Sequence, residues 1–495
     1  MVQEEYSTKK TLKNTSIYFI TGVLQKALSF FLLPLYTIYL TPGDYGLVAL
    51  ISTFFGVVAL LITIALNGAI ARYYFVYKND ERKQKEFMGT IIIGVIFNCI
   101  LWFILILGFR NIITGFFLKD IDFFPYIFLA LLSTVTSPIY FIYQTILQVK
   151  QDAKGYSINS IFYFLLAVSL NLLFIVGFKL GATGLLLAGA IPSVLFSFIA
   201  TIVLIKKRYI AIAFKWTHMV EALRFSIPLI PHILSGSIAD YISKSFLYLK
   251  SNLANVGLFN IAFQFGTILD IIQSSISSAL LPMVYDTLDN HRENEQNLIK
   301  TTTLFFKVIC FFALGLTLTS KEIVFFMTSN TNFHIAWRAI PIIAFGALFY
   351  SLYNTYSNLL FYNIKGTRYI WIASLSGNLA NIAITVWLTS RFMYLMPAIA
   401  GVIQKAIMFL IVFYISRKLE PVKYELQKMM LIILLFIFAT TIGLAPDIIM
   451  PNEHLNIYWF FWKTLIFIIA GTILLYDDRI IMKTLIMKYI SNYRK

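Results

Sequence analysis

The sequence has little charge for its length. Only 13% of its 495 residues are Asp, Glu, Lys or Arg, whereas 59% are apolar, and the mean hydropathy is +0.79. A soluble protein has about 25% charged residues, roughly twice this fraction. The longest polar stretch, around 72–86, is too short to form a domain of its own. These features exclude a soluble enzyme or an extramembrane catalytic module and predict a membrane protein.

Residues that carry common site chemistry are also scarce. The two cysteines, Cys99 and Cys310, lie inside apolar runs, so no disulfide framework is indicated. The five histidines lack metal-ligand spacing, and neither H-E-x-x-H nor G-x-x-x-x-G-K-[ST] occurs. We therefore expect no metal, no cofactor, no P-loop ATP hydrolysis and no enzyme activity.

Long apolar runs are abundant, and they predict an all-α polytopic membrane protein with about fourteen spans. Inner segments hold 28 of the 40 Lys and Arg residues, counting Lys428 at the edge of its span with them, and outer loops hold 6. This bias predicts cytoplasmic termini and explains the net charge of +17 without a nucleic-acid partner. The predicted spans are 14–40, 46–70, 88–109, 125–147, 157–178, 182–205, 225–249, 256–282, 301–319, 336–361, 369–389, 396–415, 428–445 and 457–476.

The chain matches itself at an offset of about 211 residues, which indicates an internal duplication. Six spans per copy predict parallel repeats, related by an axis along the membrane normal with a cavity between them. We predict an N-terminal lobe at 1–205, a cytoplasmic amphipathic linker at 206–224, a second lobe at 225–415, and an extra hairpin with a cytoplasmic tail at 416–495. The matching pairs include Gly46-Leu47 with Gly257-Leu258, Tyr74 with Tyr285, Cys99 with Cys310, and Lys154-Gly155 with Lys365-Gly366.

Five charged residues lie well inside predicted spans: Lys26, Asp240, Lys244, Asp270 and Lys405. A charge at mid-membrane costs about 2.5–3.5 kcal/mol on insertion scales, so such residues face a cavity or a partner. Asp240 and Lys244 are four residues apart on one helix face and can form an ion pair. Lys26 aligns near Ser237 of the repeat-related span. We therefore predict that Lys26, Asp240, Lys244 and Lys405 line a substrate cavity.

Each of these residues also has a simpler interpretation. Asp240 and Lys244 could only neutralise each other, and Lys26 or Lys405 could extend to the headgroups. Asp270, and alternatively Asp240, is a candidate for binding the coupling proton or sodium ion, but Asp270 could simply pair with a neighbouring lysine. Lys463 lies near a span end, where extension towards the headgroups is the expected behaviour.

Three prolines are candidate hinges, and one arginine is a candidate gate residue. Pro228 and Pro231 lie three residues apart in the predicted seventh span, and Pro34 lies late in the first. Proline frees backbone carbonyls and bends a helix, so these positions are candidate hinges, although a static kink is an equal alternative. Arg72 ends the second span, where it is a topology anchor or part of an inner gate.

Three segments resemble Wzx-type polysaccharide flippases of the multidrug/oligosaccharidyl-lipid/polysaccharide exporter superfamily. They are SFFLLPLYTIYLTPGDYGLVAL from Ser29, LRFSIPLIPHILSGSIADYISKSFL from Leu223 and VGLFNIAFQFGTILDIIQSSISSALLPMVY from Val256. The resemblance implies a two-lobe transporter in the bacterial cytoplasmic (inner) membrane that moves undecaprenyl-diphosphate-linked oligosaccharide between leaflets. It implies a role for Lys26 in binding the anionic headgroup, because relatives keep a basic residue there.

We therefore expect a flippase for surface polysaccharide such as O-antigen, working by alternating access and coupled to an ion gradient. Its expected partners are the lipid-linked oligosaccharide, anionic membrane lipid, and a polysaccharide polymerase and glycosyltransferases, with the protein itself a monomer. A proton- or sodium-coupled multidrug or cation antiporter of the same fold is the alternative. A polytopic polysaccharide polymerase fits less well, since no large extramembrane loop is present.

Overall fold

The computed structural model describes residues 17–18, 21–22, 30, 32–289, 295–362, 364–419, 422–450 and 454–476. These residues form helices and connecting turns, with no strand among them. Thirteen of the helical segments in this part of the chain are long and apolar enough to cross a membrane. The predicted all-α membrane fold is thereby confirmed. About half of the predicted first span, 14–40, falls outside the described residues, as do Lys26 and the tail from 477.

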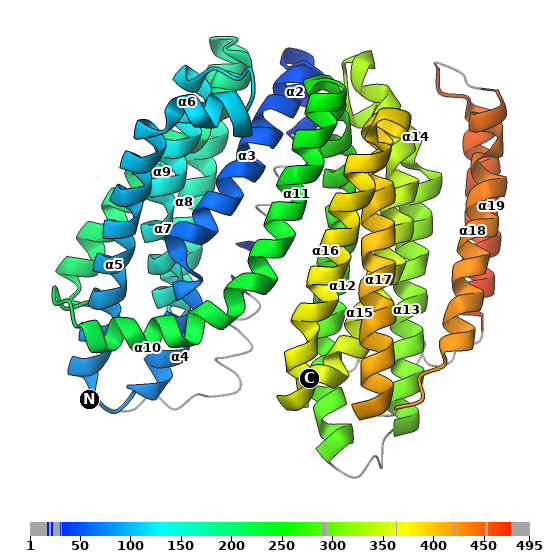
Figure 1. The fold of residues 1–495 in the computed structure, drawn as a ribbon. Coiled ribbons are helices and arrows are strands. Elements are labelled where there is room, and N and C mark those ends of the chain that lie inside the picture. Colours follow the sequence, from blue (N-terminus) through cyan, green and yellow to red (C-terminus); the bar gives the residue numbers. More distant parts are fainter. Residues whose placement is uncertain are drawn as a thin grey trace. The chain divides into compact units, whose positions relative to one another are not determined.

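Contacts divide the chain into two compact units, Met1–Gly257 and Leu258–Lys495. The lobe boundaries at 206–224 and 416 stay a prediction. The helices of the first unit are α2 (Leu33–Tyr39), α3 (Pro42–Thr63), α4 (Leu66–Val76), α5 (Glu81–Gly108), α6 (Arg110–Ile112), η1 (Ile113–Phe117), η2 (Phe123–Ile127), α7 (Phe128–Val149), α8 (Ala153–Asn171), η3 (Leu172–Gly177), α9 (Gly181–Lys206), α10 (Trp216–Ser226), η4 (Ile227–Leu229) and α11 (Ile230–Lys250) (Figure 1).

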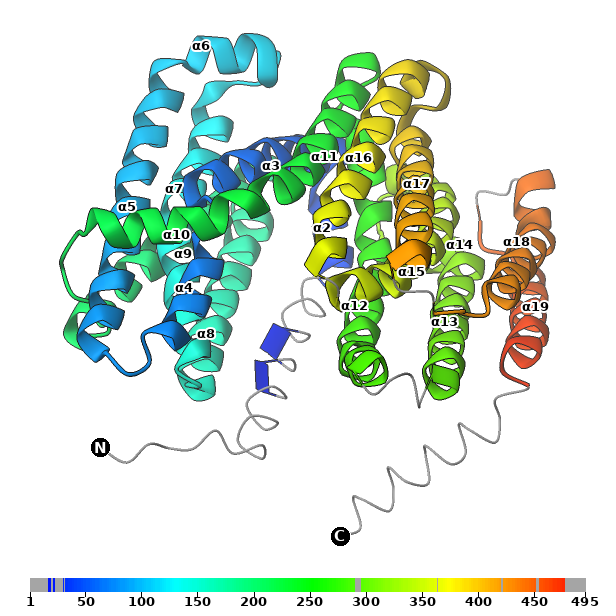
Figure 2. The same cartoon turned by 60° about the horizontal axis from the view of Figure 1, so that its bottom comes forward.

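The second unit contains most of α12 (Leu253–Asp289). In this unit α18 and α19 pack against each other as a hairpin, and both also pack on α13. Both views show this hairpin beside α13 (Figures 1 and 2). The other helices of this unit are α13 (Glu295–Leu318), α14 (Ser320–Met327), η5 (Thr331–Ala339), α15 (Ile340–Tyr362), α16 (Ile364–Phe392), η6 (Met393–Leu395), α17 (Met396–Leu419), α18 (Leu426–Ile449) and α19 (Ile457–Leu475).

Short polar residues fix where several spans begin. Thr41 and Asp44 form a capping box at the start of α3, with the Thr41 side chain accepting from the Asp44 amide. Asp80 caps α5 and Asp152 caps α8, each accepting a backbone N–H three residues later, at 3.0 and 2.8 Å. Two of these caps, Asp80 and Asp152, follow short loops, so consecutive spans are placed side by side by local sequence.

The two glycines that the repeat aligns, Gly46 and Gly257, meet in the first unit. A Cβ on Gly46 would lie 1.8 Å from the Leu253 carbonyl oxygen, and one on Gly257 would lie 1.9 Å from that of Pro42. Only glycine permits backbones to approach this closely. Residues 253–257 are thereby held directly against the start of α3.

The second span is broken, which the sequence did not predict. Between α3 and α4, Ile64 (φ 48°) and Ala65 (φ 53°) are both left-handed. For a β-branched residue this conformation is strained, at a cost on the order of 1–3 kcal/mol. The Asn98 amide donates to the carbonyls of residues 61 and 62 at 3.0 and 2.7 Å, and the hydroxyl of Ser226 donates to that of Ala65. These side chains stabilise the break by replacing the lost helical hydrogen bonds.

Replacing Asn98 with Ala should lower stability, because two carbonyls inside the membrane would lose their side-chain donor. A buried polar group without a partner costs about 1–3 kcal/mol. Thermal unfolding in detergent measures the effect, with exposed Asn111→Ala as the control. Equal melting of Asn98→Ala and the wild type would show that the break does not depend on this amide.

The prolines predicted as hinges lie at helix beginnings. Pro228 lies in η4 and Pro231 in the first turn of α11, so the chain turns steeply between α10 and α11 (Figure 1). Pro34 lies in the first turn of α2. Proline fits the first turn of a helix without breaking a hydrogen bond. A hinge role for any of the three stays a prediction.

Candidate functional site

The predicted ion pair on α11 is present. The Lys244 Nζ lies 3.1 Å from the Asp240 Oδ2, and the Lys244 side chain is 5% exposed while that of Asp240 is 44% exposed. The next residue, Tyr241, donates its hydroxyl to the Phe117 carbonyl, and Tyr248 donates to that of Lys119 at 3.1 Å. In addition, α11 packs along α3. The pair is therefore held on a helix that is fixed at several points within the first unit.

Two predicted residues from distant spans, Asp270 and Lys405, come together in the second unit. Asp270 lies on α12 and Lys405 on α17, and the Tyr350 ring of α15 lies near both. The Lys405 Nζ is 5.5 Å from the centre of the Tyr350 ring, and Asp270 is close enough to act electrostatically on both groups. The two charges do not form a direct ion pair. Without a direct pair, the Asp270 carboxylate can take up a proton or a cation, and the Lys405 ammonium can bind an anionic ligand.

Uncharged polar side chains lie near these two charges along α12 and α17. Gln404, next to Lys405, accepts from Asn381 at 2.8 Å and donates to Asn378 at 2.6 Å, which links α17 to α16. Gln273, three residues after Asp270, is 2% exposed, and neither amide atom has a hydrogen-bond partner among the described residues. A buried amide without partners is costly, so Gln273 can take a water molecule or a polar ligand as its partner.

Arg72, the candidate gate residue, lies on α4 and is exposed. Its guanidinium lies 4.9 Å from the centre of the Phe225 ring of α10. This cation–π contact places it against the linker helix. The structure thus gives Arg72 a packing partner, and its gating role stays a prediction.

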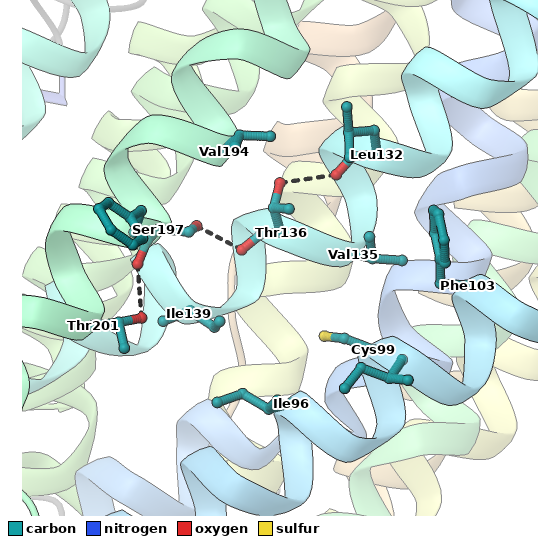
Figure 3. A pocket seen from close by; sticks show the side chains of 12 residues that line it. Ile96, Cys99, Phe103, Leu132, Val135, Thr136, Ile139, Val194, Ser197 and Thr201 are labelled. Atoms are coloured by element: carbon teal, nitrogen blue, oxygen red, sulfur yellow. Dashed lines mark hydrogen bonds between the residues drawn. The ribbon is translucent and has the colours of Figure 1, made fainter.

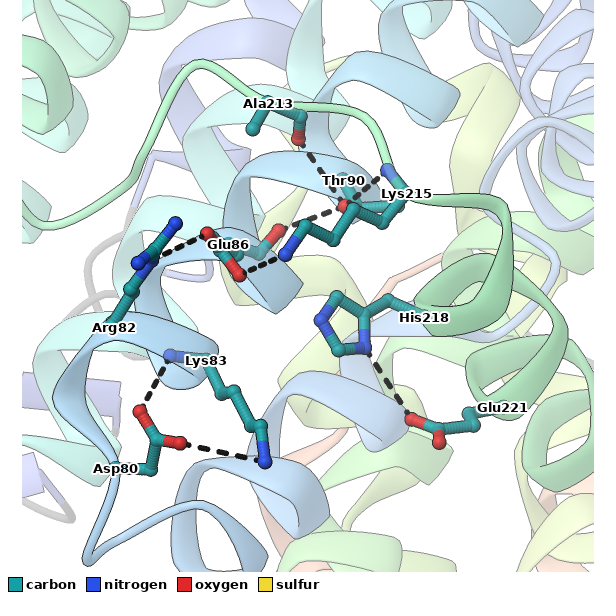
Figure 4. Close-up of polar contacts among 9 residues, drawn as sticks. All are labelled: Asp80, Arg82, Lys83, Glu86, Thr90, Ala213, Lys215, His218 and Glu221. Atoms are coloured by element: carbon teal, nitrogen blue, oxygen red, sulfur yellow. Dashed lines mark hydrogen bonds and ion pairs between the residues drawn. The ribbon is translucent and has the colours of Figure 1, made fainter.

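The linker is bound to the ends of α4 and α5 by a polar cluster that sequence reasoning missed (Figure 4). Glu86, with a side chain 9% exposed, binds Arg82 at 3.1 Å and Lys215 at 2.5 Å. The Thr90 hydroxyl donates to the Ala213 carbonyl and accepts from the amide of Lys215. Glu86 inside a basic loop was visible in the sequence, but its second partner, Lys215, lies 129 residues away.

A second part of this cluster ties α10 to the end of α4. The Tyr77 hydroxyl donates to the Glu221 carboxylate at 2.5 Å, and the His218 Nδ1 lies 3.5 Å from the same carboxylate. Desolvation and this hydrogen bond raise the pKa of Tyr77 well above its ordinary value. The phenol therefore stays protonated and acts as a donor across the accessible pH range.

A buried group of four charges joins α14, α18 and α19 in the second unit. Asp447 binds Lys321 at 2.8 Å and Lys463 at 2.5 Å, and Lys463 also binds Glu322 at 2.6 Å. Asp447 and both lysines are at most 3% exposed. The expectation that Lys463 extends to the headgroups is therefore wrong, because its ammonium forms ion pairs with acids on two other helices. No local spacing in the sequence indicated these contacts.

A groove of about 430 Å³ lies between α5, α7 and α9 (Figure 3). Its hydroxyl groups are all engaged within the protein: Ser197 donates to the Thr136 carbonyl, Thr136 to that of Leu132, and Thr201 to that of Ser197. The rest of the lining is apolar, with the Cys99 thiol at one side. The groove therefore offers a surface for hydrocarbon and no binding groups for a sugar or phosphate.

Comparison with known proteins agrees with these features. Residues 11–288, more than half of the chain, match the model of the family described as polysaccharide biosynthesis protein. The chain is 21% identical over 304 residues to Lsg locus putative protein 1 of Haemophilus influenzae, covering 61% of this chain and 72% of that protein.

Solved structures share the fold at low identity. The lipid II flippase MurJ in an inward closed conformation has a TM-score of 0.72 at 16% identity, covering 96% of this chain and 100% of that one. The Vibrio cholerae MATE transporter VcmN in its bent form has a TM-score of 0.55 at 15% identity, covering 86% and 100%. The family expected from the sequence is thereby confirmed: the chain belongs to the polysaccharide biosynthesis protein family and has the fold of the MurJ and MATE transporters.

Proposed function

We propose that this protein is a flippase that moves undecaprenyl-diphosphate-linked oligosaccharide from the inner to the outer leaflet of the bacterial cytoplasmic membrane. Membership of a polysaccharide biosynthesis family and a fold shared with a lipid flippase support a lipid-linked glycan as cargo. The observation that carries the headgroup assignment is Lys244, a buried cation inside a span that is paired with a half-exposed acid. A diphosphate can replace the Asp240 carboxylate as its partner.

In this proposal Lys26 and Lys244 bind the anionic headgroup, and Asp240 competes for Lys244 when the cargo leaves. Lys405 serves the same purpose in the second unit, where Asp270 is the proposed site of the coupling proton or sodium ion. Transport proceeds by alternating access, and surface polysaccharide biosynthesis is the pathway served. We expect Lys26→Ala to abolish surface polysaccharide at a normal protein level, because the span-1 cation would be lost.

The test uses purified protein in liposomes that contain a fluorescent lipid-linked oligosaccharide, and it measures the rate at which the headgroup changes leaflets. Lys244→Met in an Asp240→Asn background should slow transport about ten- to a hundredfold, since a hydrogen bond to a charged group is worth about 1.5–3 kcal/mol. The Asp240→Asn background avoids an unpaired acid, so that the loss reports on cargo binding.

Exposed Lys250→Met at the end of the same helix is the matched control. Headgroup transport at the wild-type rate by the double variant would rule out Lys244 as a binding residue. If the wild-type protein moves a cationic dye and not the glycolipid, the protein is the drug or cation antiporter. That alternative shares the MATE fold.

A further inference from the structure

A cavity of about 490 Å³ lies in the first unit between the linker and the second and third spans. Ile64 and Leu66, on both sides of the helix break, form one wall, and Gly94 and Phe97 of α5 form another. Phe214 and Trp216 of the linker form the third. Neither Asp240 nor Lys244, the described transport residues of this unit, lines the cavity.

The lining is almost entirely apolar. Besides the indole N–H of Trp216, its polar side chain is Asn98, whose amide nitrogen already donates to the carbonyls of residues 61 and 62. At about 490 Å³ the cavity has room for a hydrocarbon segment such as an acyl chain.

The walls of the cavity are fixed in place by the linker contacts. The Ala211 amide donates to the Lys85 carbonyl at 3.0 Å, and a Cβ on Gly89 would lie 1.8 Å from the Ala211 oxygen. The Lys215–Glu86 ion pair follows directly after Phe214. The linker is therefore docked closely on α5, and the cavity does not depend on a ligand to form it.

The linker presents groups that suit a charged lipid. Trp216 is 66% and Phe214 47% exposed, as is usual for aromatic residues at the headgroup level. Lys207 and Arg208 are exposed at the start of the linker, and Arg224 is exposed beside Leu223, which lines the cavity. Basic residues next to a membrane surface attract anionic headgroups. The charge of the linker thus complements that of an anionic phospholipid.

We propose that this cavity binds one acyl chain of an anionic phospholipid, whose headgroup contacts the basic linker residues. The chain packs against the break at Ile64 and Ala65 and fills space that would otherwise be empty beside a strained backbone. This lipid site is independent of the cargo and would exist whether the protein is a flippase or an antiporter.

Native mass spectrometry of the delipidated full-length protein tests the site, with phosphatidylglycerol or phosphatidylcholine of sixteen-carbon chains added back. We expect one bound phosphatidylglycerol and weaker binding of phosphatidylcholine. Lys207→Gln with Arg208→Gln should reduce this preference about thirtyfold, which equals about 2 kcal/mol at 1.4 kcal/mol per tenfold. Exposed Lys300→Gln is the charge control and should leave the preference unchanged.

Phe214→Ser with Trp216→Ser should weaken both lipids at least about tenfold through the lost apolar contact, whereas Trp387→Ser, 78% exposed on α16, should not. A phosphatidylglycerol with a diazirine on its acyl chain should label residues 93–98 and 214–223 of the unmodified protein, so the test does not depend on the folding of a variant. Equal binding of the two phospholipids, no labelling of these segments, or displacement by polyprenyl phosphate would overturn the proposal.

Discussion

Replacing Asp270 with Asn should abolish the response of transport to an ion gradient while leaving the protein folded. In the proposal this carboxylate takes up the coupling proton or sodium ion. The asparagine amide that replaces it can bind neither, so the transport rate should fall to that measured without a gradient. The nearby Lys405 and Tyr350 make the site sensitive to the charge on Asp270. Liposomes with imposed proton or sodium gradients, and headgroup transport as the readout, measure the effect.

Two further variants separate coupling from structure. Asp270→Glu keeps the carboxyl group and should recover gradient-driven transport in part. If the carboxylate had only a structural role, this recovery would not be expected. Asp286→Asn changes an exposed acid on the same helix and should behave as the wild type. Gradient-driven transport at full rate by Asp270→Asn would mean that coupling uses another residue, such as Asp240.

Replacing Lys463 with Met should remove most of the stability that holds the last hairpin to the second unit. Glu322 would lose its ion pair with Lys463, and Asp447, 2% exposed, would keep its ion pair with Lys321. Removing one member of a buried ion pair costs about 3–5 kcal/mol, because the remaining charge stays buried. We expect a large drop in melting temperature in detergent and a lower yield of membrane-inserted protein.

The control for this effect is an exposed pair at the other end of α18. Lys428 binds Glu425 at 2.5 Å, but its side chain is 63% exposed, so Lys428→Met should cost at most about 1 kcal/mol. Adding Glu322→Gln to Lys463→Met should restore part of the lost stability, because one uncompensated charge is removed. If Lys463→Met and Lys428→Met melt alike, the buried group contributes little to holding the hairpin.

The spans themselves could be predicted from the sequence, because the cost of placing polar groups in hydrocarbon acts on every residue of a run. The pair of Asp240 and Lys244 could also be predicted, since four-residue spacing on a helix decides it. The family was recognisable from the three segments that begin at Ser29, Leu223 and Val256. These features all depend on residues that are neighbours along the chain.

The features that the sequence did not reveal depend on distant partners. Ile64 and Ala65 contain no glycine or proline signal, and the break depends on Asn98 and Ser226 from other helices. Asp270 and Lys405 are 135 positions apart, so their proximity required the packing of α12, α15 and α17. Lys463 looked like a headgroup lysine because the acids that bind it lie on other helices.

The buried charges of the hairpin also bear on how the chain is assembled during synthesis. Asp447 emerges from the ribosome before Lys463, and each would meet a cost of up to about 2.5–3.5 kcal/mol if it entered the lipid alone. Lys321 and Glu322, on α14, are synthesised before both of them. Joint insertion of α18 and α19, directly against the earlier helices, would therefore avoid this cost, because each buried charge would meet its partner as it enters the membrane.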